Sequence, residues 1–351
     1  IDTQKVHISS AIASGYKYML IVTSDEAKAR KMCDDASFFN KEAIYYPAKD
    51  AIFYSADVHG NQITGERLRC ISRIINHSST GEGVLTVVTT MDGIADRLIP
   101  VERFKEAVIT LDYSSEIEPE KLAKKLVAMG FVRTGMVEDK GQFAIRGGII
   151  DIFSYTDEAP VRIELWDTEV DSIRMFDVES QRSIERLQSY SIFPATEYIF
   201  TEDELKNGLY NIKEECDRQL ECFDYGKRKR TKEQIEAGNN LNKLVADVER
   251  TGNYEKFTDT LVADTVGLAE YFPEENTLVV LDEPNRLKEC NELTLYEYNE
   301  SMKNRLAAGY VLPSQTNKVK AMNEIISDLR NNKKLILTTL AVSYTHLRAH
   351  E

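Results

Sequence analysis

Several features that would assign this sequence to a class are missing from it. There is no run of about eighteen apolar residues, the length that a membrane-spanning helix needs. There is no signal peptide, and because the chain begins at Ile1 rather than Met we expect its natural N-terminus to lie upstream. With 42% hydrophobic and 29% charged residues, the composition is that of a globular protein, and 351 residues suffice for two or three domains.

Cysteine and histidine are too few and too scattered to suggest redox or metal chemistry. The five cysteines form no C-x-x-C pair, and an odd number in a long chain favours free thiols in a reducing compartment. No histidine lies in a motif for nucleophilic catalysis. His346 and His350 have the spacing of metal ligands on a helix, but no third ligand accompanies them. We therefore predict no catalytic residue, no metal site and a cytoplasmic protein.

The sequence also lacks the loop G-x-x-x-x-G-K-[ST], which cradles nucleotide phosphates. At the position expected before the first helix, residues 2–7 read DTQKVH, so Lys5 has neither the glycines nor the hydroxyl of such a loop. The apolar run 278–281, followed by Asp282 and Glu283, is similar to a Walker B strand, in which Asp holds Mg²⁺ and Glu orients water. We interpret Lys5, Asp282 and Glu283 as a degenerate nucleotide site and expect neither ATP nor Mg²⁺ to act in this chain. An ATP-hydrolysing helicase lobe stays as an alternative.

Basic residues do not dominate the chain, whose formal net charge is −14. That charge argues against a nucleic-acid surface over the whole molecule, since phosphate binding depends on Lys and Arg. One basic cluster comprises Lys227, Arg228, Lys229, Arg230 and Lys232. It keeps a direct DNA-binding module as a second alternative, although a solvated loop between two helices explains it better. An acidic chain favours a protein partner.

The first hundred residues alternate between strand and helix signals. Apolar runs at 18–23, 43–46 and 84–89 are typical of buried parallel strands. Helices are expected between them, at about 25–38 with Ser24 as its cap and at about 63–75. Strands separated by helices predict a parallel α/β layer.

Antiparallel strands dominate from about residue 106 to residue 193. A helix carrying Leu122 and Leu126 should stop at Gly130. Strands are then predicted at 142–146, 149–153 and 161–166, and Asp167-Thr168 turns the last of these into a further strand that ends at Phe176. The pattern predicts a small α+β domain.

After Pro194 the pattern is mostly helical. Thr201 with Glu204 and Thr231 with Gln234 form capping boxes, and we expect Leu205 and Ile235 to point inward. Strands at 277–281 and 334–340 are able to rejoin the first sheet, which would make the middle domain an insertion. Residues 342–351 do not fit the rest of the chain, and we interpret them as a non-native tail.

Trp166, the only tryptophan, points to a binding surface. Strand alternation places it on the same face as Arg162, opposite an apolar face, and places Ala144 and Arg146 outward on the predicted neighbouring strand. If these strands pair, Arg146, Arg162 and Trp166 form one patch of residue types enriched at binding hot spots. The alternative is that Trp166 covers a helix inside the domain.

Residues 141–183 carry the most specific motif, GQFAIRGGIIDIFSYTDEAPVRIELWDTEVDSIRMFDVESQRS. This segment resembles the N-terminal, UvrB-like module of transcription-repair coupling factors. The segments YPA at 46–48, PATE at 194–197 and VLDEP at 280–284 resemble the same family. The resemblance covers residues 1–341.

The resemblance implies a RecA-like, P-loop NTPase-like lobe with a degenerate nucleotide site, interrupted by an inserted domain. The expected parts are a RecA-like domain at 1–105, an inserted α+β domain at 106–193 and a mostly helical return segment at 194–341. In the family the inserted domain binds UvrA, the damage-recognition protein of the repair excinuclease. The matching positions here are Arg146, Arg162 and Trp166, the last of which is usually Phe in the family.

Full-length members of this family are ATP-dependent DNA translocases. They displace RNA polymerase stalled at DNA damage, act on double-stranded DNA in the bacterial cytoplasm, and recruit UvrA. Their polymerase-binding domain and motor would lie beyond the end of this chain. The resemblance thus implies a non-catalytic adaptor fragment, with ATP and Mg²⁺ used only by the motor.

Overall fold

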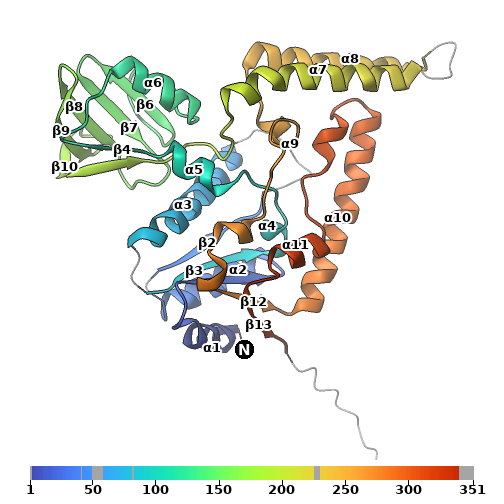
Figure 1. The fold of residues 1–351 in the computed structure, drawn as a ribbon, viewed down its shortest axis with the longest axis horizontal. Coiled ribbons are helices and arrows are strands. Elements are labelled where there is room, and N and C mark those ends of the chain that lie inside the picture. Colours follow the sequence, from blue (N-terminus) through green and yellow to red (C-terminus); the bar gives the residue numbers. More distant parts are fainter. Residues whose placement is uncertain (1, 41, 50–57, 81–82, 225–229, 340–351) are drawn as a thin grey trace, which may run out of the picture.

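A computed structural model describes residues 2–40, 42–49, 58–80, 83–224 and 230–339 of the chain (Figure 1). The fold is mixed α/β, built around a parallel sheet and a larger, mostly antiparallel sheet. Figure 1 shows the antiparallel sheet at upper left, a pair of long helices along the top and the parallel sheet below them. No helix in the described ranges is long and apolar enough to cross a bilayer.

The parallel sheet has the strand order β13-β12-β1-β3-β2. Its strands are β1 (Tyr18–Thr23), β2 (Glu42–Tyr46), β3 (Leu85–Thr90), β12 (Thr277–Asp282) and β13 (Lys333–Leu337). All of its neighbouring strands run parallel, and every residue of β1 and β3 is buried, as their apolar runs predicted. Because β12 pairs with β1, the last part of the chain returns to the first sheet, also as predicted.

Helices cover both faces of this sheet. On one face α1 (Asp2–Ala13) and α2 (Glu26–Ser37) pack through Val6 and Met32, and on the other lie α3 (Val58–Thr80) and α10 (Pro284–Ala307). The predicted cap of α2 was wrong by one residue. Asp25 is the N-cap, with extended backbone, and its carboxylate accepts a hydrogen bond of 2.9 Å from the Lys28 backbone N–H. We call the parallel sheet and these helices the parallel lobe.

Residues 109–192 form a second unit, which we call the antiparallel unit. Its six-stranded sheet consists of β5 (Val132–Arg133), β6 (Gln142–Arg146), β7 (Ile149–Phe153), β8 (Val161–Trp166), β9 (Glu169–Phe176) and β10 (Ser183–Arg186), in the order β10-β9-β8-β7-β6-β5. Beside it β4 (Ile109–Asp112) pairs with β11 (Ser189–Ile192). The helix α6 (Pro119–Ala128) buries Leu122 and Leu126 against one face, the inner face. Gly130 follows it with a φ of +87°, the left-handed conformation that ends a helix.

The opposite, outer face of this sheet is covered at only one end. Ala144, which we predicted to point outward, is buried there with Val137 and Phe153, and Val178 packs against them. Strand alternation gave the correct face for Ala144 but not its environment. Segments 134–141 and 177–182 fold over this end. Nothing in the sequence of β6 itself indicates that these segments cover it.

The predicted helical region is an antiparallel pair, α7 (Glu202–Asp224) and α8 (Lys232–Thr251). Both capping boxes are present, with the Thr201 N–H donating to Glu204 and the Thr231 N–H donating to Gln234. Leu205 and Ile235, however, are exposed rather than inward. Each lies in the first turn of its helix, close to the start of α7 or α8.

Shorter elements complete the chain. They are α4 (Met91–Ile94), α5 (Val101–Ala107), α9 (Thr258–Leu261), α11 (Met322–Asp328) and the 3₁₀ segments η1 (Glu255–Phe257), η2 (Leu268–Tyr271), η3 (Glu274–Asn276) and η4 (Pro313–Thr316). A cleft of about 1500 Å³ separates the antiparallel unit from α8 and the parallel lobe.

Candidate functional site

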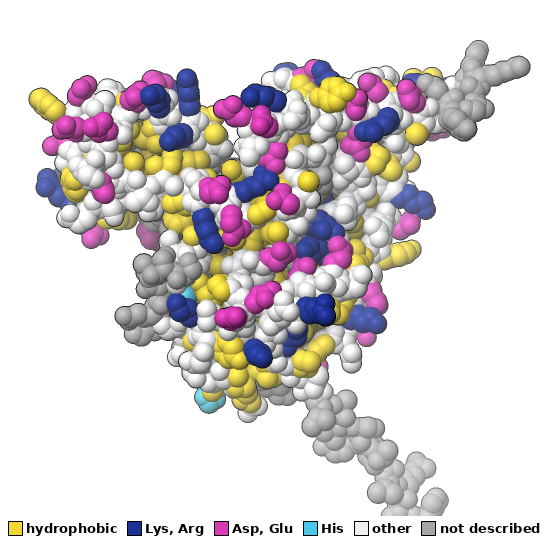
Figure 2. Space-filling model, in the orientation of Figure 1, with side chains coloured by type: hydrophobic (Ala, Val, Ile, Leu, Met, Phe, Trp, Pro, Cys, Tyr) yellow, Lys and Arg dark blue, Asp and Glu magenta, His cyan; other side chains and the backbone are white. Residues whose placement is uncertain are grey.

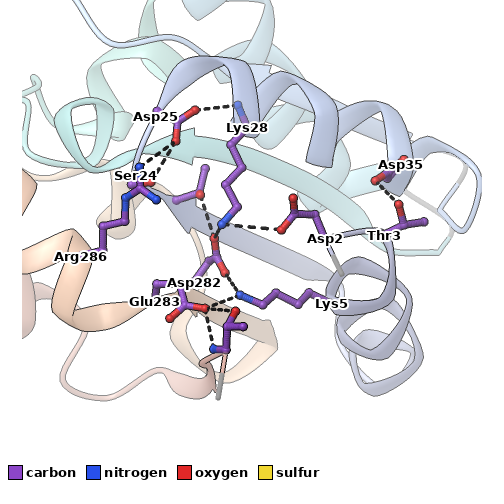
Figure 3. Close-up of polar contacts among 12 residues, drawn as sticks. Asp2, Thr3, Lys5, Ser24, Asp25, Lys28, Asp35, Asp282, Glu283 and Arg286 are labelled. Carbon is purple, nitrogen blue, oxygen red and sulfur yellow. Dashed lines mark hydrogen bonds and ion pairs between the residues drawn. The ribbon is translucent and has the colours of Figure 1, made fainter. Parts of the chain in front are cut away.

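A cluster of charges lies at the carboxyl end of β12, around the buried carboxylate of Asp282 (Figure 3). The Lys5 Nζ lies 2.7 Å from Asp282 Oδ1 and 2.7 Å from Glu283 Oε1. Lys28 pairs with Asp282 Oδ2, to which the Thr23 hydroxyl also donates at 2.9 Å. Both oxygens of Asp282 therefore accept from ammonium groups, and a divalent cation would have to displace Lys5 or Lys28.

The same contacts shift the acidity of the two carboxylates. Burial opposes ionisation of Asp282, but hydrogen bonds from Lys28, Lys5 and Thr23 hold its pKa below the ordinary value. At Glu283, hydrogen bonds from Lys5 and Thr339 lower the pKa to about 2. The Thr339 backbone N–H and hydroxyl each lie 2.6 Å from Glu283 Oε1. Both carboxylates are thus held in the ionised form by the chain itself.

The structure brings Lys5, Asp282 and Glu283 together across 277 residues of sequence. It corrects the interpretation of residues 2–7, which lie within α1 and not in a loop ahead of the first helix. Sequence reasoning missed Thr23 and Lys28. The usable signal was that Thr23 ends β1, because the carboxyl ends of neighbouring parallel strands meet at one edge of the sheet. No group of three or more His, Cys, Asp or Glu side chains within the described residues is placed to hold a metal ion.

A second cluster lies on the outer face of the antiparallel unit, around the carboxylate of Asp151, which is 1% exposed. The Arg162 guanidinium donates to both of its oxygens, from Nε at 2.6 Å and from Nη2 at 2.8 Å. Arg146 donates from Nη2 at 2.6 Å. Two arginines from strands on either side of β7 therefore share one buried carboxylate.

Arg162 is enclosed more than the sequence suggested. Its Nη2 also donates to Gln181 Oε1 at 2.8 Å, and its guanidinium lies 4.2 Å above the Phe176 ring. Its side chain is 13% exposed, whereas that of Arg146 is 43% exposed. Arg146 is therefore the cation of this pair that a partner reaches more easily.

Trp166 is 80% exposed at the end of β8, opposite Glu169. The alternative that it covers a helix inside the domain is wrong. It lies four residues beyond Arg162, about 13 Å along the strand, and Glu164 stands between them and pairs with Arg174. Arg146 and Arg162 thus meet at Asp151, while Trp166 stands apart at the uncovered end of the same face.

Strand alternation also places Glu164 on the face of Arg162 and Trp166, but sequence reasoning missed Asp151 and Arg174 as members of this surface. Asp151 is an acidic residue inside the apolar run IIDIF, and a carboxylate within such a run was the available signal, because a buried charge needs partners. The uncovered end of the outer face, with Arg146, Glu164, Trp166 and Arg174, is called the open end below.

Two predicted features cannot be placed. Residues 225–229, which hold Lys227, Arg228 and Lys229, and the tail 342–351 lie outside the described residues. Arg230 and Lys232 lie at the start of α8. Figure 2 shows Lys and Arg side chains interspersed with Asp and Glu on the visible face, without a continuous basic band.

Two of the cations that line the cleft between the two units are already paired. Lys49 lies 3.2 Å from Glu197, and Arg67 pairs with both Glu197 and Asp96. These side chains neutralise one another, so they offer little attraction for a nucleic-acid backbone.

The residues of the antiparallel unit match a known domain family. Residues 109–198 match the family model described as the UvrB interaction domain. This match spans β4 to β11 and includes Arg146, Asp151, Arg162 and Trp166.

The longer comparison concerns DNA repair proteins called transcription-repair-coupling factors. The chain is 34% identical to that of Bacillus subtilis over 322 residues, which is 89% of this chain and 26% of the relative. It is 30% identical to that of Staphylococcus aureus strain Mu50 over 304 residues, 86% of this chain and 25% of the relative. These similarities confirm the resemblance to transcription-repair coupling factors, and the chain spans about a quarter of the length of the relatives it matches.

Proposed function

We propose that this chain is the adaptor part of a transcription-coupled DNA repair factor and binds UvrA through the outer face of the antiparallel unit. One observation carries the proposal. The outer face leaves both a tryptophan, 80% exposed, and an arginine, 43% exposed, open to solvent within the part of the chain that matches the UvrB interaction domain. Exposed aromatic and arginine side chains of this kind are typical anchors of protein interfaces.

The parallel lobe would act as a degenerate RecA-like scaffold for this unit. We infer a RecA-like domain at 1–105 and a return segment at 194–341, with residues 106–193 inserted between them. The return of β12 and β13 to the first sheet supports that division. The closed cluster of Lys5, Lys28, Asp282 and Glu283 supports a lobe that uses neither ATP nor Mg²⁺ and performs no catalysis.

The remaining functions follow from the family and belong to the rest of the protein. An ATP-driven translocase motor on double-stranded DNA, and contact with stalled RNA polymerase, would lie outside this segment. The adaptor would then bring UvrA to the damaged site in the bacterial cytoplasm.

Arg146, Arg162 and Trp166 would contribute to binding in different ways. Arg146 retains guanidinium donors beyond the one that binds Asp151 and is placed to pair with a carboxylate of the partner. Trp166 would enter an apolar pocket. Arg162, which sequence reasoning paired directly with the partner, has its Nε and Nη2 already bound within the unit.

The test is a binding titration of the 351-residue chain with purified UvrA. Trp166→Ala should weaken binding by about 2 kcal/mol, roughly thirtyfold, as expected for an interface anchor. Phe38→Ala is a matched control, because Phe38 is an 83% exposed aromatic on the parallel lobe. A folded wild-type chain that does not bind UvrA, or equal losses in both variants, would contradict the proposal.

A further inference from the structure

The structure shows how two arginines of like charge are held close together on one sheet face. Arg146 on β6 and Arg162 on β8 flank Asp151 on β7, which stands directly opposite Arg162 in the strand register. The carboxylate accepts three guanidinium hydrogen bonds of 2.6 to 2.8 Å. With 1% of its surface exposed, Asp151 cannot itself form the contact area of an interface.

The physical need for such a carboxylate is clear. Two guanidinium groups on nearby strands repel each other, and a free arginine side chain loses rotamer entropy when it is fixed. A shared carboxylate offsets the repulsion and restricts both side chains before any partner arrives. Less conformational entropy is then lost on binding, and preorganisation raises affinity in this way.

The cluster is anchored at one side and open at the other. Gln181 and the Phe176 ring hold Arg162 toward the covered end of the outer face. Arg162 in turn holds Asp151 with two bonds, and Asp151 holds Arg146 with one. The side chains of Arg162 and Asp151 are 13% and 1% exposed, whereas that of Arg146, at the open side, is 43% exposed. Arg162 is therefore the fixed support of the cluster, and Arg146 is the cation that it exposes to solvent.

We propose that Asp151 is the positioning residue of the docking surface: it acts through Arg146 and Arg162 and presents Arg146 to a carboxylate on the partner. The proposal rests on the proposed function and deepens it, because it assigns separate roles to the two arginines. Arg162 is a support, Arg146 is the contact, and Asp151 joins them without touching the partner.

The experiment is a double-mutant cycle measured as affinity for UvrA. Asp151→Asn keeps the shape of the side chain and one acceptor oxygen but removes the charge. We expect Asp151→Asn and Arg146→Ala each to weaken binding about tenfold, and the double variant to bind no more than about twofold worse than either. Such non-additivity distinguishes action through Arg146 from a general loss of structure.

Glu120→Gln is the control for charge, because Glu120 pairs with Arg133 elsewhere in the same unit and its loss removes the same charge. It should bind as the wild type does. Losses that multiply in the double variant, or an Asp151→Asn chain with wild-type affinity while Arg146→Ala is impaired, would overturn the proposal.

A second variant covers the case in which Asp151→Asn does not fold. Arg162→Lys keeps the positive charge but replaces a two-point grip on Asp151 by a single ammonium contact. It should weaken binding about threefold through loss of positioning, and wild-type affinity would overturn the proposal. If the wild-type chain fails to bind, the proposed function itself fails. If it binds and Trp166→Ala is impaired while these variants are not, only the role of Asp151 fails.

Discussion

The two charge clusters of this molecule are built alike but differ in how far they are exposed to solvent. Each contains one buried aspartate, Asp282 in the parallel lobe and Asp151 in the antiparallel unit, and each aspartate binds two cations from other elements. Around Asp282 the cations are lysines that are 10% and 17% exposed. Around Asp151 they are arginines, one of which is 43% exposed. The first cluster is closed, and the second faces solvent.

The difference follows from the chemistry of the cations and from their place in the fold. A lysine ammonium has three donors, and Lys5 uses two of them on Asp282 and Glu283. An arginine has five donors in a planar fork, so it binds a carboxylate of its own chain and keeps donors for another. Lysines of α1 and α2 that close over the carboxyl end of β12 therefore form a structural staple, whereas arginines on a half-covered sheet face form a surface that is prepared for a partner.

The largest effect should come from breaking the closed cluster. Asp282→Asn would leave Lys5 and Lys28 buried without their shared charge, and such a loss costs about 3 kcal/mol or more of unfolding free energy. Urea denaturation followed by circular dichroism measures it. Asp203→Asn, at an exposed carboxylate of α7, should change stability by less than about 0.5 kcal/mol. An Asp282→Asn chain as stable as the wild type would remove the staple interpretation.

Acid should weaken the same cluster. The pKa of Glu283 is about 2, against an ordinary value of 4.5, and that of Asp282 is also lowered. Because both groups are more acidic in the folded chain than in the unfolded chain, their contribution is complete above about pH 5 and is lost as the pH falls toward about 2. Urea midpoints measured from pH 7 to pH 3 should therefore fall less steeply in Glu283→Gln than in the wild type. Parallel profiles would contradict this account.

A smaller effect tests the open end. Trp166→Phe keeps an aromatic anchor of the kind that the related family usually carries, and it should change affinity for UvrA by less than about 1 kcal/mol. Stability should not change, because the side chain is largely exposed. A loss as large as that of Trp166→Ala would show that the indole itself is recognised.

The last prediction is that adding Mg-ATP has no effect on the chain. Mg-ATP should produce no binding heat in calorimetry with the 351-residue chain, because both oxygens of Asp282 already accept from lysines. Saturable heat that disappears in Asp282→Asn would restore the alternative of an ATP-hydrolysing lobe and would make the two clusters functionally alike.

Much of the fold was predictable from local patterns. The apolar runs of β1 and β3 predicted buried central strands, and both capping boxes at Thr201 and Thr231 are formed. Strand alternation placed Trp166 on one face with Arg162 and favoured partial exposure, while the alternative of a covered tryptophan stayed open; the side chain is 80% exposed. These signals succeed because burial, capping and strand pleat depend on residues within a few positions of each other.

Tertiary structure alone decided the environments of the charged side chains. Asp282 binds Lys5 and Lys28, which come from the opposite end of the chain, and Val178 helps to cover Ala144. Asp151 lies only 5 and 11 residues from Arg146 and Arg162, but it joins them only because the three strands pair in this register. A sequence determines which face a side chain occupies, because the period of its own element sets that face. Whether the face is closed by other segments or left open depends on how those segments pack, and in this protein that packing separates a structural staple from a proposed docking surface.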